Sequence, residues 1–208
     1  MRRLKATGKA RLANDWPCYH TELYTFTLGA QLVGIVGCAV GSPFAVLIAE
    51  ELFASDCRLL ISITSAGQIT LSGKPPYFVV IDRALRDEGT SYHYAEPSEY
   101  SEAEPDLVAV AAEAIKAKGV NVVIGSSWTT DAPFRETEEA ITAAHSKGIL
   151  AVEMEAAALY AFARSSNRKV ICLAHVTNTM AVAEQDFEKG EADGTVEALR
   201  VLEGMIGA

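Results

Sequence analysis

The stretch Val152-Glu153-Met154-Glu155-Ala156-Ala157-Ala158-Leu159-Tyr160 decides how this chain is interpreted. The apolar run 148–152 leads into it and predicts a strand, and the helix-forming run 156–164 follows at once. Glu155 is therefore expected at a strand-to-helix junction, near the positive end of a helix dipole, where a negative charge is stabilised.

A junction of this kind lies at the carboxyl edge of a parallel α/β sheet, where ligands bind. A carboxylate at Glu155 can accept two hydrogen bonds from a vicinal diol, such as the 2′,3′-hydroxyls of ribose, and Met154 can pack under the sugar ring. The alternative is an acidic first helical turn, which is common in proteins. These residues alone leave both interpretations open.

Length and composition predict one globular domain, residues 1–208, with an atypical basic segment at residues 1–20. Half of the residues are hydrophobic and 22% are charged, which excludes a disordered chain. The net charge is −9 although the first residues are basic, and an acidic body argues against a nucleic-acid partner. The basic start is either a solvated terminus or an arm that binds phosphate. Its charges are Arg2, Arg3, Lys5, Lys9 and Arg11.

Two further classes of protein are excluded by pattern. No apolar stretch reaches the roughly 18 residues that a membrane helix needs, and no apolar region follows the basic start as in a secretory signal. The four cysteines form no Cys-x-x-Cys pair, which favours reduced thiols and a cytoplasmic protein. The four histidines have no metal-ligand spacing, so we expect no bound metal.

Strand-like and helix-like segments alternate through most of the chain. This alternation predicts a three-layer α/β/α fold around a central mixed, mostly parallel sheet. One helix is expected to begin at Ser42-Pro43, with Ser42 as its N-cap. The predicted strands are 24–28, 32–40, 58–64, 77–81, 120–124, 148–152 and 169–176, and further helices are predicted at 106–118, 138–147, 156–164 and 195–206.

Candidate ligand-binding residues follow several of these strands. After strand 58–64 come Ser65, Ala66 and Gly67, whose amides and hydroxyl can hold an anion; a tight turn without a ligand is the alternative. After strand 169–176 comes Asn178, whose amide can donate to and accept from a base; an ordinary turn is the alternative.

An aromatic and polar segment follows strand 120–124. Trp128, Phe134 and Arg135 combine stacking surface with hydrogen-bonding groups, which suits a heterocyclic base. A core tryptophan beside a polar turn is the alternative. The carboxyl ends of parallel strands share one edge, so these residues are expected near Glu155.

The chain resembles the nucleoside phosphorylase family that includes uridine phosphorylase and hexameric purine nucleoside phosphorylase, from about Tyr24 to the C-terminus. The stretch 152–160 is similar to the ribose-binding signature of that family. Further similar segments are Trp128-Thr129-Thr130-Asp131-Ala132-Pro133-Phe134-Arg135-Glu136-Thr137, Gly89-Thr90-Ser91-Tyr92-His93-Tyr94 and Val40-Gly41-Ser42-Pro43-Phe44-Ala45.

This resemblance implies phosphorolysis of a purine or pyrimidine nucleoside to a free base and a pentose 1-phosphate. It implies no metal or organic cofactor, inorganic phosphate as co-substrate, and a homo-oligomer, either a dimer or a trimer of dimers. The implied catalytic residues are Glu155 and Asn178. The implied substrate-binding residues are Glu153, Met154, Glu155, Ser65, Ala66, Gly67, Trp128, Phe134, Arg135 and Asn178.

The chain also departs from the family at its phosphate site. No Gly-x-Pro-x-Arg-like loop precedes Tyr24, Ser62 stands where the resemblance implies an arginine, and Asn178 stands where purine-specific members carry an aspartate. An amide cannot donate a proton as a carboxylic acid does. Two alternatives therefore stay open beside a phosphorylase: a nucleosidase that uses water, and a nucleoside-binding protein with weak turnover.

Overall fold

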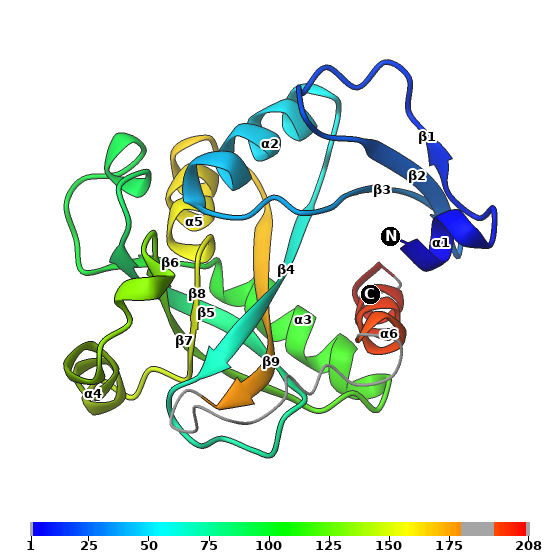
Figure 1. Ribbon diagram of the computed structural model, residues 1–208. Helices are drawn as coiled ribbons and strands as arrows, with labels where there is room; N and C mark the ends of the chain where they lie inside the picture. The colour runs from blue at the N-terminus through cyan, green and yellow to red at the C-terminus, as the bar shows by residue number, and fades with distance from the viewer. Residues whose placement is uncertain (1, 180–193, 207–208) are drawn as a thin grey trace.

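The computed structural model describes residues 2–179 and 194–206 (Figure 1). Helices and strands alternate in it as predicted, and the fold is a mixed α/β fold. The elements are α1 (Arg2–Ala6), β1 (Arg11–Leu12), β2 (Leu23–Leu28), β3 (Gln31–Val36), α2 (Ser42–Ala54), β4 (Leu60–Gln68), β5 (Tyr77–Asp87), η1 (Ser91–His93), β6 (Tyr100–Glu102), α3 (Pro105–Ala117), β7 (Val122–Thr130), η2 (Pro133–Arg135), α4 (Glu138–Ser146), β8 (Ala151–Glu153), α5 (Ala156–Ser165), β9 (Val170–Thr179) and α6 (Thr195–Ile206).

The main sheet has the strand order β6-β5-β7-β8-β4-β9 and closes on itself because β5 also pairs with β9. The pairs β4–β9, β5–β7 and β7–β8 are parallel, whereas β4–β8, β5–β6 and β5–β9 are antiparallel. The predicted three-layer, mostly parallel arrangement is therefore not confirmed: the sheet is mixed and barrel-like. A register shift between Ile81 and Ala84 lets the long strand β5 bend, as bulges do where sheets curl.

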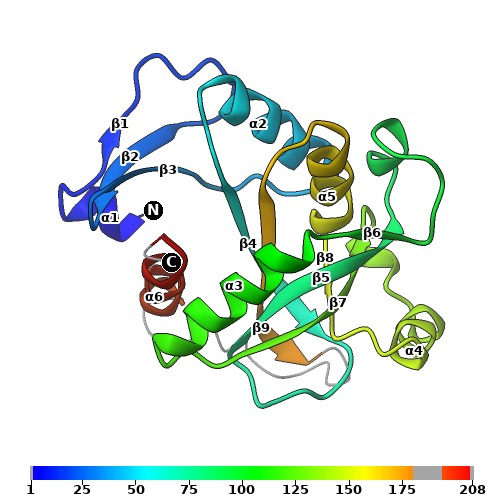
Figure 2. The same cartoon turned by 180° about the vertical axis from the view of Figure 1, so that it is seen from behind.

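The helices lie on different sides of this barrel. Helices α2 and α5 lie beside one another at one end, and α3 runs along β5 and β7, as the view from behind shows (Figures 1 and 2). Helix α6 packs against α3 so closely that a Cβ atom at Gly204 would lie 2.7 Å from the carbonyl oxygen of Ala114. No helix in the described ranges is long and apolar enough to cross a bilayer.

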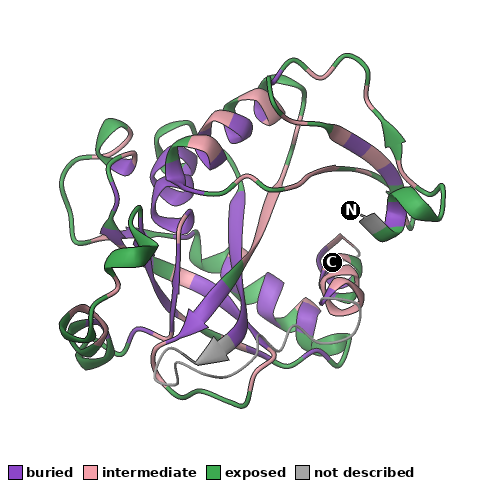
Figure 3. Cartoon of the chain, in the orientation of Figure 1, coloured by how far each residue is buried: buried purple, intermediate pink, exposed green. Residues whose placement is uncertain are grey.

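Buried residues are concentrated on the barrel strands and on α5 (Figure 3), and the core cluster continues onto α2, α3 and α6. Every residue of α5 from Ala156 to Ala163 is buried, because its many alanines let the helix lie close to the strands. The Tyr160 hydroxyl donates to the Ile81 carbonyl at 2.6 Å and accepts the Cys172 amide at 2.9 Å. Tyr160 thereby supplies a hydrogen bond to a backbone carbonyl of β5 at the point where the register of β5 shifts.

A second sheet, in the order β1-β2-β3, lies apart from the barrel (Figure 1). The run 32–40 is apolar almost throughout, which predicts a strand buried in a sheet that is covered on both faces. This expectation is wrong. Strand β3 is an edge strand that ends at Val36, and none of its residues is buried. Its apolar sequence matches the pattern of a buried strand, but among the described strands it pairs with β2 alone.

Three strands of the barrel continue past their apolar runs into polar residues. Strand β4 continues through Ser65, Ala66 and Gly67, so the alternative interpretation of this triplet as a tight turn is wrong. Strand β7 continues to Thr130 and β9 to Thr179. Backbone pairing with neighbouring strands holds these polar ends in extended form, and they carry most of the candidate site.

Candidate active site

Glu155 lies at the junction between β8 and α5, as predicted, and takes the N-cap position of α5. Its side chain is buried, and two groups distant in sequence hold its carboxylate. The Gly41 amide donates to Oε1 at 2.7 Å and the Thr64 hydroxyl donates to Oε2 at 2.9 Å. The carboxylate is thus fixed at both oxygens by α2 and β4.

The first turn of α2 also holds the residue before Glu155. Ser42 is completely buried, and its hydroxyl donates to the Met154 carbonyl at 2.8 Å. The predicted N-cap role of Ser42 is wrong, because Gly41 occupies the N-cap position with a φ of 89°, a conformation that favours glycine. The strand-to-helix junction and the start of α2 are therefore joined through both backbone and side chain.

The Glu153 carboxylate accepts more hydrogen bonds than the Glu155 carboxylate does. Its Oε2 accepts the amides of Glu155 and Ala156, each at 2.7 Å, and its Oε1 accepts the hydroxyls of Ser127 and Thr129. Burial, together with the smaller effect of the Glu155 charge, raises the pKa of Glu153 from 4.5 to about 7, although Thr129 and the two amides act in the opposite direction. Glu153 caps α5 and uses both of its oxygens inside the protein.

Thr129 connects this acid to the helix a second time. Its hydroxyl donates to Glu153 and accepts the Ala157 amide at 2.9 Å. Helix α5 thus has three of its first N–H groups satisfied by β7 and β8 side chains, which fixes where Glu155 stands.

Trp128 lies on the opposite face of β7 from Ser127 and Thr129, as alternation along a strand requires. It is buried against Ile149 and Val152, and its indole N–H donates to the Asp87 carboxylate at 2.9 Å. The structure therefore does not bring Trp128 together with Glu155. The predicted base-stacking role of Trp128 stays a prediction.

The remaining predicted base-binding residues lie in η2 or at the end of β9. Phe134 is fully exposed and Arg135 is exposed, and neither forms a hydrogen bond or ring contact with a described site residue. Asn178 pairs through its backbone with Gly67, which brings the ends of β9 and β4 together. The Asn178 side chain lies outside the described residues.

The three residues predicted to bind phosphate, Ser65, Ala66 and Gly67, all lie on β4 but differ in their exposure. All three residues pair with β9, but Ser65 is exposed, next to Thr64, whereas Ala66 and Gly67 are buried. Ser62 is half-buried on β4, opposite Cys172. Within the described ranges, none of the hydrogen bonds or ion pairs brings a Lys or Arg side chain to Ser62, Ser65 or Glu155.

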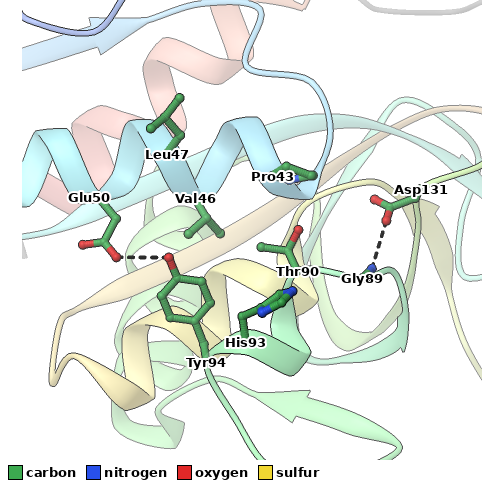
Figure 4. Close-up of a pocket in the computed structure, with 9 residues that line it drawn as sticks. All are labelled: Pro43, Val46, Leu47, Glu50, Gly89, Thr90, His93, Tyr94 and Asp131. Atoms are coloured by element: carbon green, nitrogen blue, oxygen red, sulfur yellow. Dashed lines mark hydrogen bonds between the residues drawn. The ribbon is translucent and has the colours of Figure 1, made fainter.

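An open pocket of about 610 Å³ lies beside α2 and is lined at the N-terminal end of that helix by Pro43 (Figure 4). Its apolar side is formed by Pro43, Val46 and Leu47 of α2. Opposite lies the loop after β5, held by hydrogen bonds from Tyr94 to Glu50 at 3.1 Å and from the Gly89 amide to Asp131 at 2.9 Å. The other lining residues are Thr90 and His93.

Sequence reasoning missed Gly41 and Thr64 as partners of Glu155. Thr64 is the first of consecutive hydroxyl residues that end an apolar run, and Gly41 directly precedes the Ser-Pro helix start. Both features mark the ends of elements. Neither feature indicates which distant acid these residues would meet.

Comparison with known proteins identifies the family to which this sequence belongs. A sequence model of the phosphorylase superfamily matches residues 2–206. A DeoD-type purine nucleoside phosphorylase of Roseobacter denitrificans is 30% identical over 168 residues, covering 77% of this chain and 70% of the relative. DeoD-type enzymes of Mannheimia succiniciproducens and Pasteurella multocida are each 26% identical over 164 residues, covering 78% of this chain and 69% of theirs. The family predicted from the residues is confirmed, and the chain belongs to the phosphorylase superfamily.

Proposed function

We propose that the chain is a nucleoside phosphorylase that cleaves the glycosidic bond of a purine nucleoside with inorganic phosphate. The observation that carries the proposal is the presentation of Glu155, next to Met154, by two fixed hydrogen bonds. A carboxylate offers about four acceptor sites. Gly41 and Thr64 use one on each oxygen, so one on each oxygen stays open for the two hydroxyls of a ribose.

The reaction requires the N-glycosidic bond to break while a phosphate oxygen bonds to C1′ of the sugar. The base leaves with the bonding electron pair and takes up, in balance, the proton that the attacking phosphate oxygen gives up, and the sugar becomes a pentose 1-phosphate. Positive charge develops on the sugar ring in the transition state, and a fixed nearby carboxylate such as Glu155 stabilises it. Ser65 is the candidate phosphate contact, and Asn178 is the candidate hydrogen-bonding partner of the base.

Glu153 has a different part in this proposal. Its oxygens are engaged by four donors within the protein, so we assign it to holding α5 and Glu155 in place. Contact between Glu153 and the sugar, and the roles of Trp128, Phe134 and Arg135 at the base, stay predictions. The same holds for the absence of a cofactor, the homo-oligomer and the cytoplasmic location.

A nucleosidase is the second candidate, and Ser62 favours it. A hydrogen bond to a charged group contributes about 1.5–3 kcal/mol, so an absent arginine weakens phosphate binding by one to two powers of ten. In such an enzyme water replaces phosphate at C1′. The hydroxyls of Ser62, Thr64 and Ser65 are then the polar side chains on this part of β4.

The test is the release of free base from purine and pyrimidine nucleosides with and without phosphate. Release that requires phosphate and yields a pentose 1-phosphate supports the phosphorylase. Equal release in phosphate-free buffer, with free pentose as product, would instead establish the nucleosidase. Binding without release of any base would identify a nucleoside-binding protein.

A further inference from the structure

Thr64 is a half-buried residue of β4 whose hydroxyl has two acceptors within reach. The Glu155 Oε2 atom lies at 2.9 Å and the Ser65 carbonyl oxygen at 3.3 Å. The hydroxyl has a single proton and can donate to only one of them at a time. The shorter contact to a carboxylate is the stronger, because hydrogen bonds to an ionised acceptor are roughly twice as strong as neutral ones.

The two protein donors act on the Glu155 carboxylate from different elements. The Gly41 amide comes from the start of α2, and the Thr64 hydroxyl comes from the middle of strand β4. A carboxylate turns easily about its last bond, since that torsion has broad minima. One donor fixes one oxygen, whereas two donors on separate oxygens fix the plane of the group.

The plane of the carboxylate decides how a diol binds. Two neighbouring hydroxyls need one open acceptor direction on each oxygen, both in the correct plane. A ligand with no sugar hydroxyls at these positions does not depend on that plane. The hydroxyl of Thr64 therefore matters for one class of ligand and not for the other.

We propose that Thr64 is a positioning residue that fixes the plane of Glu155 and thereby makes the site select nucleosides with both a 2′- and a 3′-hydroxyl. The proposal rests on the proposed function for the identity of the ligand. The contact between Thr64 and Glu155 is observed in the structure and does not depend on the proposed function.

The first test compares Thr64→Val with the wild-type protein by calorimetry, using a purine ribonucleoside and its 2′,3′-dideoxy analogue. The valine keeps the shape of the side chain and removes the hydroxyl. We expect the dissociation constant of the ribonucleoside to rise about tenfold and that of the dideoxy analogue to change less than twofold. Thr64→Ser, which retains the hydroxyl, restores the ribonucleoside affinity.

Thr70→Val is the matched control, because the half-buried Thr70 hydroxyl donates to the Ile149 carbonyl at 2.7 Å and does not contact Glu155. It leaves the ratio of the two affinities unchanged. In a Glu155→Gln background, Thr64→Val adds no further loss. An equal loss for both ligands in Thr64→Val, or a loss that serine does not restore, would overturn the proposal.

A second test needs no nucleoside. A crystal structure of unliganded Thr64→Val is expected to show the Glu155 carboxylate turned about its last bond, with Oε1 still on the Gly41 amide. An unchanged carboxylate would overturn the positioning role even if the protein is a phosphorylase. A turned carboxylate in a protein that binds no nucleoside would leave the contact established and refute the proposed function.

Discussion

The carboxylate of Glu153 accepts the backbone N–H of Glu155 at 2.7 Å, so one acid of the pair holds the backbone of the other. The two acids thereby divide two tasks that their sequence spacing does not distinguish. Glu153 has four donors and faces the inside of the fold, whereas Glu155 has two donors and retains open acceptor sites. Helix capping by Glu153 and the proposed sugar binding by Glu155 are thus placed two residues apart.

The raised pKa of Glu153 predicts a particular pH dependence of stability. A carboxyl group whose pKa is about 7 in the folded protein and near 4.5 when unfolded is protonated more readily when folded. Its contribution is fully present below about pH 4.5 and is lost as the pH rises through 7. The difference corresponds to at most about 3 kcal/mol.

We therefore expect the free energy of unfolding of the wild-type protein, relative to Glu153→Gln, to fall between pH 4.5 and 8. Urea unfolding at a series of pH values measures this difference. Glu203→Gln, on the exposed side of α6, controls for the loss of one carboxylate. If the free energies of unfolding of wild type and Glu153→Gln changed in parallel with pH, the raised pKa of Glu153 would be contradicted.

Removing the Tyr160 hydroxyl is predicted to destabilise the barrel. In Tyr160→Phe the Ile81 carbonyl and the Cys172 amide lose a buried partner, which costs about 1–3 kcal/mol. Thermal or urea unfolding measures the loss. Tyr92→Phe, at a half-exposed tyrosine, is the matched control and should change stability by less than about 0.5 kcal/mol. Equal stability of the two variants would refute the bridging role.

Trp128→Phe separates packing from base recognition. The variant loses the indole hydrogen bond to Asp87 and part of the packing against Ile149, so we expect about 1–3 kcal/mol lower stability. Nucleoside affinity should be unchanged, since Trp128 faces away from the Glu155 side of β7. A large loss of affinity at unchanged stability would instead support the base-stacking role predicted from the sequence.

The sequence predicted local features of this fold well. The Glu155 junction was predictable because an apolar run, two acids and an alanine-rich run are adjacent in the chain. The bounds of α6 matched their prediction for the same reason, because its amphipathic pattern is complete in itself. The position of Trp128 on the opposite face of β7 from Thr129 also follows from strand alternation, provided that β7 is known to extend past the apolar run.

Features that depend on distant pairing were not predictable. The closure of the sheet rests on β5 pairing with β9, which no local pattern encodes. Strand β3 has the composition of a buried strand and lies last in its sheet among the described strands. The donors to Glu155 lie 114 and 91 residues away in sequence, so the site could be assembled only once the tertiary structure was known.

The most direct test of this account is nucleoside binding by Glu155→Ala, measured by titration calorimetry with a purine ribonucleoside, with Glu139→Ala on exposed α4 as control. We predict that Glu155→Ala weakens binding at least a hundredfold, about 3 kcal/mol, while circular dichroism shows an intact fold. The control should bind as the wild type does. An affinity in Glu155→Ala equal to that of the wild type would contradict the role of Glu155 in holding the sugar.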